Sequence, residues 1–293
     1  MGEPNLGLLA TILQTGFFQL EDVSPASIAA YVRTLQALSP DQRIQAASQH
    51  TREAIRHAFK QVKMLGEDLP PYGAWRALAE ARYGTLPHAL QVRDPEYVTT
   101  IAGVDLARMA SAVGFALEAA GVRWCLSGAL ARCAFGEPRP IADLEFLGVV
   151  EKPALPVLLK QLGEAFWANP AQLEEAADKR ETAVLYHLAT LTQIRFVPPG
   201  AEPQASALSR RVRVEGSACG RLWVQAPEDS VLQGLLAWRD ADEGEEIHWR
   251  DVALLLAAQP AMDAGYLDAS AQASDVAETL REARTQSGAG GGA

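Results

Sequence analysis

The segment 121–150, GVRWCLSGALARCAFGEPRPIADLEFLGVV, constrains the fold more than any other part of the chain. The apolar run Val122–Leu126 predicts a buried strand, and the small residues Ser127-Gly128 predict a turn directly after it. A short helix is expected over 129–135, because Gly136 and two prolines follow it. The run Asp143–Leu147 predicts a second strand, so the segment has the order strand, turn, helix, strand.

Two acidic residues stand at alternate positions of the second predicted strand. Successive side chains of a strand point to opposite faces, so Asp143 and Glu145 are expected on one face, about 7 Å apart along the chain. Two carboxylates that point the same way beside a small-residue turn are suited to hold a divalent metal against a phosphate.

The order of these elements resembles the nucleotidyltransferase fold of the polymerase-beta type, in which an Asp-x-Asp or Asp-x-Glu pair follows a Gly-Ser or Gly-Gly turn. The resemblance implies Mg²⁺ held by Asp143 and Glu145, with Ser127 and Gly128 close to the phosphates of a nucleoside triphosphate. The implied reaction is in-line attack of an acceptor on the α-phosphate, with loss of pyrophosphate.

The C-terminal third extends the resemblance toward minimal and abortive-infection-type nucleotidyltransferases. In those proteins a strand leads into a Pro-Glu-Asp helix start, and an Arg/Lys-Asp pair with an apolar helix and an Asp-x-x-Tyr-Leu segment come after it. This chain has the same order in 224–229 (VQAPED), in Arg250-Asp251 with the apolar run after it, and in 263–267 (DAGYL). The resemblance therefore covers about residues 100–270. Glu228 and Asp229 follow Pro227 and are equally suited to the positive end of a helix.

Two features of that family are replaced in this chain. The position expected for the third metal-binding acid holds Arg195, and Gln233-Gly234 stand where a phosphate-binding Lys is expected. An Arg there would repel a metal and is expected to pair with Asp143 or Glu145; with Ser127 and Gly128 it is also a candidate nucleotide-binding residue. The alternative to an active transferase is therefore a catalytically inactive relative that acts as a regulatory or partner-binding module.

The whole chain is expected to be α+β, with a small mixed sheet, its helices, and an α-helical region before them. The expected divisions are an N-terminal helical region of unknown role (1–94), an α/β core (95–226), a C-terminal helical part of the same domain (227–286) and a disordered tail (287–293). Within them we expect a linker at 84–93, a helix over 153–167, a hairpin over 183–197, short strands at 211–215 and 221–225, and a polar loop with His248 and Trp249.

The clearest predicted helix begins at Pro40, where Ser39 and Gln42 form a capping box. Its second face carries the basic residues Arg43, Arg52, Arg56, Lys60 and Lys63. This face is expected to be solvated, and the alternative is a surface for a nucleic acid or a protein partner.

Composition limits the remaining classes of function. Hydrophobic residues make up 48% of 293 residues, which supports a substantial core. The net charge of −10 argues against a large nucleic-acid-binding surface and leaves a local basic patch open. The three cysteines lack metal-ligand spacing, and Cys125 is expected in the core. No signal peptide or membrane span is evident, so a cytoplasmic protein is expected.

Overall fold

The structure is a computed structural model that describes residues 25–64, 80, 85–91, 105–200, 204–241 and 246–287. Most of the helix expected near residue 80, the helix start expected at Asp94 and the tail after Ser287 lie outside these residues.

Seven strands of the described residues form one mixed sheet in the order β3-β4-β5-β2-β1-β7-β6. The strands are β1 (Trp124–Ser127), β2 (Leu144–Gly148), β3 (Phe166–Trp167), β4 (Ala183–His187), β5 (Thr192–Val197), β6 (Val212–Gly216) and β7 (Gly220–Val224). β2 is antiparallel to β1 and parallel to β5, and β1 is parallel to β7. The expected hairpin is β4–β5, and a second hairpin, β6–β7, forms the far edge of the sheet.

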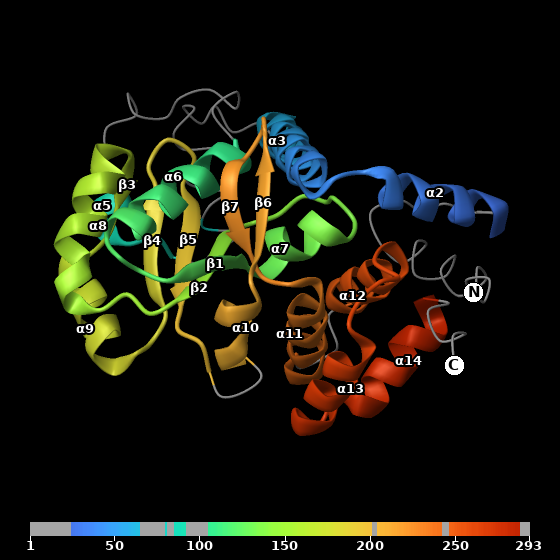
Figure 1. The fold of residues 1–293 in the computed structure, drawn as a ribbon. Helices are drawn as coiled ribbons and strands as arrows, with labels where there is room; N and C mark the ends of the chain where they lie inside the picture. The colour runs from blue at the N-terminus through green and yellow to red at the C-terminus, as the bar shows by residue number, and fades with distance from the viewer. Residues whose placement is uncertain are drawn as a thin grey trace.

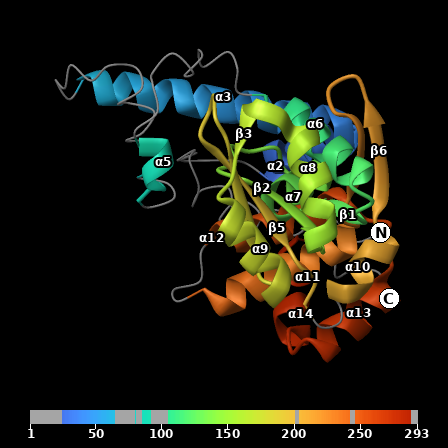
Figure 2. The same cartoon turned by 90° about the vertical axis from the view of Figure 1, so that its left-hand side faces the viewer.

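Helices surround this sheet and continue after it. They are α2 (Pro25–Ala37), α3 (Pro40–Met64), α5 (His88–Gln91), α6 (Leu106–Ala119), α7 (Gly128–Phe135), α8 (Leu155–Leu162), α9 (Pro170–Lys179), α10 (Gln204–Arg210), α11 (Pro227–Asp240), α12 (Glu246–Ala258), α13 (Ala264–Ala273) and α14 (Ala277–Ser287). In two perpendicular views α3 lies beyond one end of the sheet, and α13 and α14 lie beyond the other (Figures 1 and 2). The expected α+β class is therefore confirmed.

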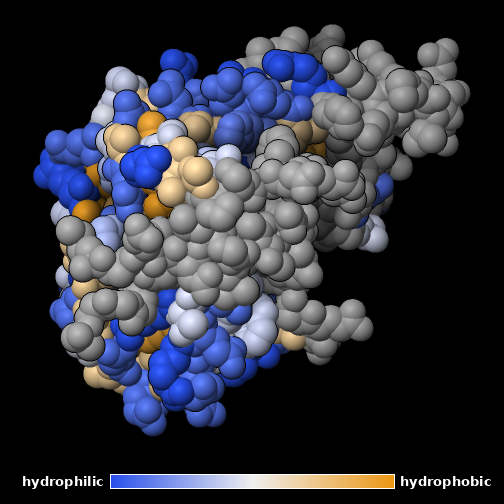
Figure 3. Space-filling model, turned by 90° about the vertical axis from the view of Figure 1, so that its right-hand side faces the viewer, coloured by the Kyte–Doolittle hydropathy of each residue, from blue (hydrophilic) through white to orange (hydrophobic). Residues whose placement is uncertain are grey.

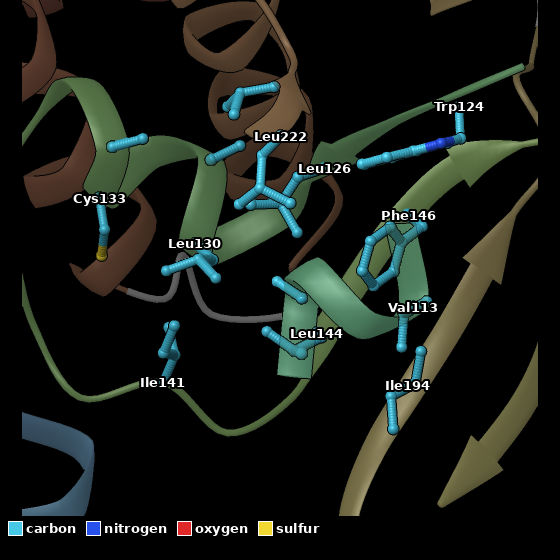
Figure 4. Close-up of a cluster of buried hydrophobic side chains, with 14 of the residues drawn as sticks. Val113, Trp124, Leu126, Leu130, Cys133, Ile141, Leu144, Phe146, Ile194 and Leu222 are labelled. Carbon is cyan, nitrogen blue, oxygen red and sulfur yellow. The ribbon is translucent and has the colours of Figure 1, made fainter. Parts of the chain in front are cut away.

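The main hydrophobic core lies on one face of the sheet, under α6 and α7. Leu126 of β1, Phe146 of β2 and Ile194 of β5 point into it and meet Val113 of α6 and Leu130 of α7 (Figure 4). These side chains are almost fully buried, because alternate residues of each strand face this core. The residues between them, including Ser127, Glu145 and Arg195, consequently face the other side of the sheet.

That second face is covered only in part by the described residues. Ala207 of α10, a helix that the sequence reading does not predict, packs there on Cys125 and Leu147, with Trp223 beside them. Toward β5 the face carries the half-buried Arg195. The polar residues singled out in the sequence therefore lie on the more open side of the sheet.

Three local expectations were wrong. The helix expected over 153–167 ends at Leu162, because Gly163 takes a positive φ of 64°; after one 3-10 turn, Phe166 and Trp167 form the edge strand β3. His248 and Trp249 lie inside α12 rather than in a loop. The expected linker at 84–93 contains α5, with Leu86 and Leu90 buried.

α3 belongs to the body of the protein. The Ser39–Gln42 capping box is confirmed, since Ser39 N donates to Gln42 Oε1 at 2.8 Å and Gln42 N donates to Ser39 Oγ at 3.3 Å. Arg43 was expected on the solvated face, and this was wrong: it is buried and donates to the carbonyl oxygens of Leu35 and Phe135. Ile44 joins the main core.

The surface on the side toward which α2 extends is mostly hydrophilic where residues are coloured (Figure 3). No helix in the described ranges combines the length and apolar character needed to cross a bilayer.

Candidate functional site

The predicted site residues form a row across three neighbouring strands. Ser127 of β1 pairs in register with Glu145 of β2, and Glu145 pairs with Arg195 of β5. Because residues in register on adjacent strands share a face, the three side chains lie side by side on the more open face. Asp143 precedes β2 by one residue, so it lies at the strand end rather than inside the strand as predicted.

Arg195 lies between the two acids. Its Nη1 is 3.4 Å from Asp143 Oδ2 and 3.7 Å from Glu145 Oε2. The side chains of Arg195, Asp143 and Glu145 are 38%, 26% and 14% exposed, so the group is partly screened from water. The predicted pairing of Arg195 with the acids is thus present with both of them.

The second oxygen of Glu145 is also bonded. Its Oε1 accepts from Ser127 Oγ at 2.8 Å and from Gln233 Nε2 at 2.8 Å. The Oε1 of Gln233, on α11, accepts from the backbone N–H of Gly128 at 3.1 Å. The amide of Gln233 therefore joins the start of α7 to β2, and it occupies the N–H that the resemblance assigns to the phosphates.

Gly128 is required at its position by the backbone and by close packing. Its φ is +64°, a left-handed value that side chains disfavour. A Cβ there would lie 3.0 Å from Glu145 Cβ. The small-residue turn thus brings the start of α7 against the acidic strand, as the sequence pattern predicts.

Gly234 lies outside the site. Gln233 reaches Glu145, whereas a Cβ on Gly234 would lie 2.5 Å from Val252 Cγ2, so Gly234 allows α11 and α12 to approach each other. Of the two residues that stand where the resembled family has a phosphate-binding Lys, Gln233 is therefore the one that contacts the site. The sequence did not predict its hydrogen bond to Glu145.

Asp251, matched to the family's Arg/Lys-Asp pair, is bound in a separate ionic cluster. It accepts from Arg132 Nε at 2.9 Å and from Arg139 Nε and Nη2 at 2.8 and 2.7 Å. Burial alone would raise the pKa of the Asp251 carboxyl, but Arg139 and Arg132 outweigh it and hold that pKa below its usual range. Next to it, Arg250 binds Glu137 through two hydrogen bonds of 2.7 Å.

Glu228 and Asp229 lie in the first turn of α11, as expected for helix-start residues. Asp229 accepts from Tyr266 Oη at 2.5 Å, and its Oδ2 lies 3.4 Å from Arg210 Nε. Burial is the main cause that raises the pKa of Asp229. These contacts connect α10, α11 and α13.

Cys125 of β1 is buried on the more open face of the sheet, where Ala207 of α10 packs on it. Burial raises the pKa of its thiol to about 12, so the thiolate that nucleophilic chemistry needs is scarce at neutral pH. Its expected place in the core is confirmed.

The donor set does not fit a divalent metal. Mg²⁺ needs carboxylate oxygens that are free to bind it, but both acids face the guanidinium of Arg195, and Glu145 Oε1 already accepts two hydrogen bonds. Among the described residues no group of three or more His, Cys, Asp or Glu side chains is placed to hold a metal ion.

Comparisons with known proteins do not assign a family. No family model and no curated protein matches the sequence. A solved structure of an antigenic nucleotidyltransferase-like protein from Paracoccidioides brasiliensis matches with a TM-score of 0.38 and 12% identity, over 64% of this chain and 94% of that chain. The assignment of a function therefore depends on the geometry of the site.

Proposed function

We propose that the protein is a nucleotidyltransferase-like module without metal-dependent chemistry, and that it works by binding a partner. The observation that carries this proposal is the position of Arg195 Nη1, 3.4 Å from Asp143 and 3.7 Å from Glu145. A guanidinium is a permanent cation, so it takes the place that a metal would have between the acids. Mg²⁺ would have to displace it against charge repulsion.

The hydrogen bonds of Gln233 support the same conclusion. A Lys at this position would offer a positive charge to the phosphates of a nucleotide, whereas the Gln233 amide is neutral and bonded at both ends. With one Arg against two acids, the group of Arg195, Asp143 and Glu145 carries a net charge of about −1, which repels a triphosphate. The residues proposed for nucleotide binding, Ser127, Gly128 and Arg195, therefore stabilise the fold of the site instead.

An active transferase is the second candidate, and one observation favours it. The contacts of Arg195 with the acids are longer than the roughly 2.7–2.9 Å of a strong charge-assisted hydrogen bond, and Arg195 is 38% exposed. If the side chain moves into solvent, Asp143 and Glu145 become available for one Mg²⁺ and a nucleoside triphosphate.

The test combines metal binding with nucleotidyl transfer. Wild-type protein and the variants Arg195→Asp and Asp143→Asn are titrated with Mn²⁺ and followed by electron paramagnetic resonance. Each is also incubated with Mg²⁺ and labelled nucleoside triphosphates. We expect no metal-dependent transfer by the wild type, and tighter Mn²⁺ binding by Arg195→Asp, which restores a third acid.

Asp143→Asn serves as the matched control, because it removes one charge from the same group and keeps the shape of the side chain. Transfer of label by the wild type that is lost in Asp143→Asn contradicts the proposal and establishes the second candidate. The partner surface predicted on the N-terminal helices stays a prediction. In the part of α3 whose side chains the structure describes, 40–56, the exposed residues include Gln49, Glu53 and Arg56; the side chains of Lys60 and Lys63 lie outside it.

A further inference from the structure

A polar cleft lies between α3, the N-terminal end of α6 and the β6–β7 turn. Its volume is about 400 Å³, which is within the range of small-molecule sites. One face of α3, between Gln45 and Arg56, forms most of its lining, and the turn adds Ser217 and Ala218. The cleft, called the α3–α6 cleft below, is thus built from three segments that are far apart in the sequence.

Positive charge is in excess in the lining of this cleft. Arg52 and Arg56 come from α3 and Arg108 from α6, whereas the acids are Glu53 and Asp105. Three arginines against two acids leave the lining with about one positive charge, in a chain whose net charge is −10. A local excess of this sign inside a cleft favours an anionic ligand.

The two acids are bonded mainly to neutral donors. Asp105 Oδ1 caps α6 by accepting from Arg108 N at 3.1 Å, and it also accepts from Ser48 Oγ at 3.4 Å. Glu53 Oε1 accepts from Gln49 Nε2 at 3.1 Å. Arg108 Nε lies 3.4 Å from Asp105 Oδ2, but the Arg108 side chain is 85% exposed, and an ion pair with such exposure holds an arginine only weakly.

Arg56 carries a charge without a partner in the part of the chain that the structure describes. Its side chain is exposed and forms no hydrogen bond or ion pair there. Arg52 lies four residues earlier on the same face of α3, and like charges at this spacing repel each other. An anion bound between the two guanidiniums would remove this repulsion.

We propose that the α3–α6 cleft binds a small molecule that carries two or more phosphate groups. Guanidiniums form paired N–H contacts with phosphate oxygens, and a single phosphate is much smaller than a cleft of this volume. Gln45, Gln49 and Ser217 offer neutral hydrogen-bonding groups to the rest of the molecule. This inference goes beyond the proposed function, because none of these residues belongs to the site of Arg195.

A small molecule is favoured over a nucleic acid. Among the described residues no aromatic side chain lines the cleft, so a base would have no ring on which to stack. A nucleic acid that extends beyond the cleft would also meet a chain whose net charge is −10, which repels its phosphates.

Isothermal titration calorimetry of the full chain tests the class of ligand. The probes are pyrophosphate, inorganic phosphate, citrate and a single-stranded oligonucleotide, all in EDTA so that no divalent metal takes part. Pyrophosphate should bind at least about tenfold more tightly than inorganic phosphate, because it meets more than one guanidinium, and more tightly than citrate or the oligonucleotide. Its binding should weaken as NaCl is added, because salt screens the charges.

Substitutions in the cleft are expected to act in opposite directions. Arg52→Gln with Arg56→Gln should weaken pyrophosphate binding at least about fivefold, because two guanidinium contacts are lost. Glu53→Gln should tighten it, because it removes a negative charge from the lining. The matched control is Arg33→Gln with Arg281→Gln, which removes the same charge from exposed positions of α2 and α14 and should leave binding unchanged.

A measurement on the wild type keeps the test decisive if a variant fails to fold. Phenylglyoxal modifies accessible arginines, and mass spectrometry locates the modified positions. Pyrophosphate should slow the modification of Arg52, Arg56 and Arg108 and leave that of Arg281 unchanged.

The proposal is overturned if pyrophosphate does not bind, if inorganic phosphate, citrate or the oligonucleotide binds as tightly, or if the cleft arginines are not protected. Protection of Arg195 in their place would assign the anion to the other site and would also overturn the proposal. Metal-dependent transfer overturns the proposed function instead, and it leaves the α3–α6 cleft untouched.

Discussion

Single residues of this chain decide how closely its helices approach. Gly234→Ala adds a methyl group where Val252 Cγ2 would lie 2.5 Å away. Although Ala favours a helix more than Gly does, overpacking between α11 and α12 should lower the free energy of unfolding by about 1–3 kcal/mol. Urea denaturation measures this change.

Gly265→Ala, in the first turn of α13, is the control for that substitution. Its nearest atom, Asp263 Oδ1, lies 3.5 Å from the added Cβ, which is ordinary van der Waals contact. Stability close to that of the wild type is expected here, and equal losses in the two variants would show that close packing is not the cause.

A second prediction at this scale concerns the charge of Asp251. Asp251→Asn leaves Arg132 and Arg139 without a carboxylate in a buried place, which should cost about 3–5 kcal/mol at pH 7. The pKa of Asp251 is lowered by folding, so its stabilising effect is complete above the unfolded pKa of about 3.9 and is lost as the pH falls toward the folded pKa. Urea denaturation of the wild type and of Asp251→Asn from pH 7 to pH 3 should therefore show that the difference between their free energies of unfolding shrinks below about pH 4. A difference that stays constant over this range would contradict the role of the charge.

At the scale of elements, Asp41 joins α3 to the β6–β7 turn. Its carboxylate accepts from Cys219 N at 2.9 Å and from Ala218 N at 3.5 Å. Burial opposes ionisation, but these hydrogen bonds prevail and lower the pKa of Asp41. Asp41→Ala leaves the buried N–H of Cys219 without this partner and should destabilise the chain by about 1–3 kcal/mol.

Hydrogen exchange locates that effect. The amide of Cys219 should exchange faster in Asp41→Ala than in the wild type, while β4 and β5 keep their protection. Gln42→Ala, which removes the neighbouring capping contact, is the control and should leave Cys219 unchanged. Equal loosening of Cys219 in both variants would contradict a direct link between Asp41 and the turn.

The sequence predicts the elements well where local rules determine them. The capping box at Ser39, the small-residue turn at Ser127-Gly128 and the alternation in β2 all depend on neighbours within a few residues. The burial of Arg43 and the contact of Gln233 with Glu145 join residues that are far apart in the chain, so neither hydrophobic periodicity nor a motif reveals them. The pairing of Arg195 was predictable only because the resemblance had aligned it with an acid.

At the scale of the whole molecule, α3 and the sheet share one core. Ile44 and Ala47 of α3 are fully buried in the same cluster as Phe135 and Phe146, and Arg43 binds the carbonyl of Phe135. The predicted division at residue 94 therefore separates regions of sequence that pack on one another. A cut at this point exposes the apolar surface that α3 covers and leaves that carbonyl without the Arg43 donor.

We therefore predict that a chain beginning at residue 95 loses its cooperative fold. Burial of apolar surface is the main favourable term in folding, and replacing it with contact to water leaves too little to offset the conformational entropy of the remaining chain. Differential scanning calorimetry should show one transition for the full chain and a broadened or absent transition for the truncated one. A control chain that ends at Ser287 keeps all described helices and should melt like the full chain. A truncated chain that melts sharply at the wild-type temperature would show that residues 1–94 are an independent domain, and that the contacts of α3 with the sheet add little to its stability.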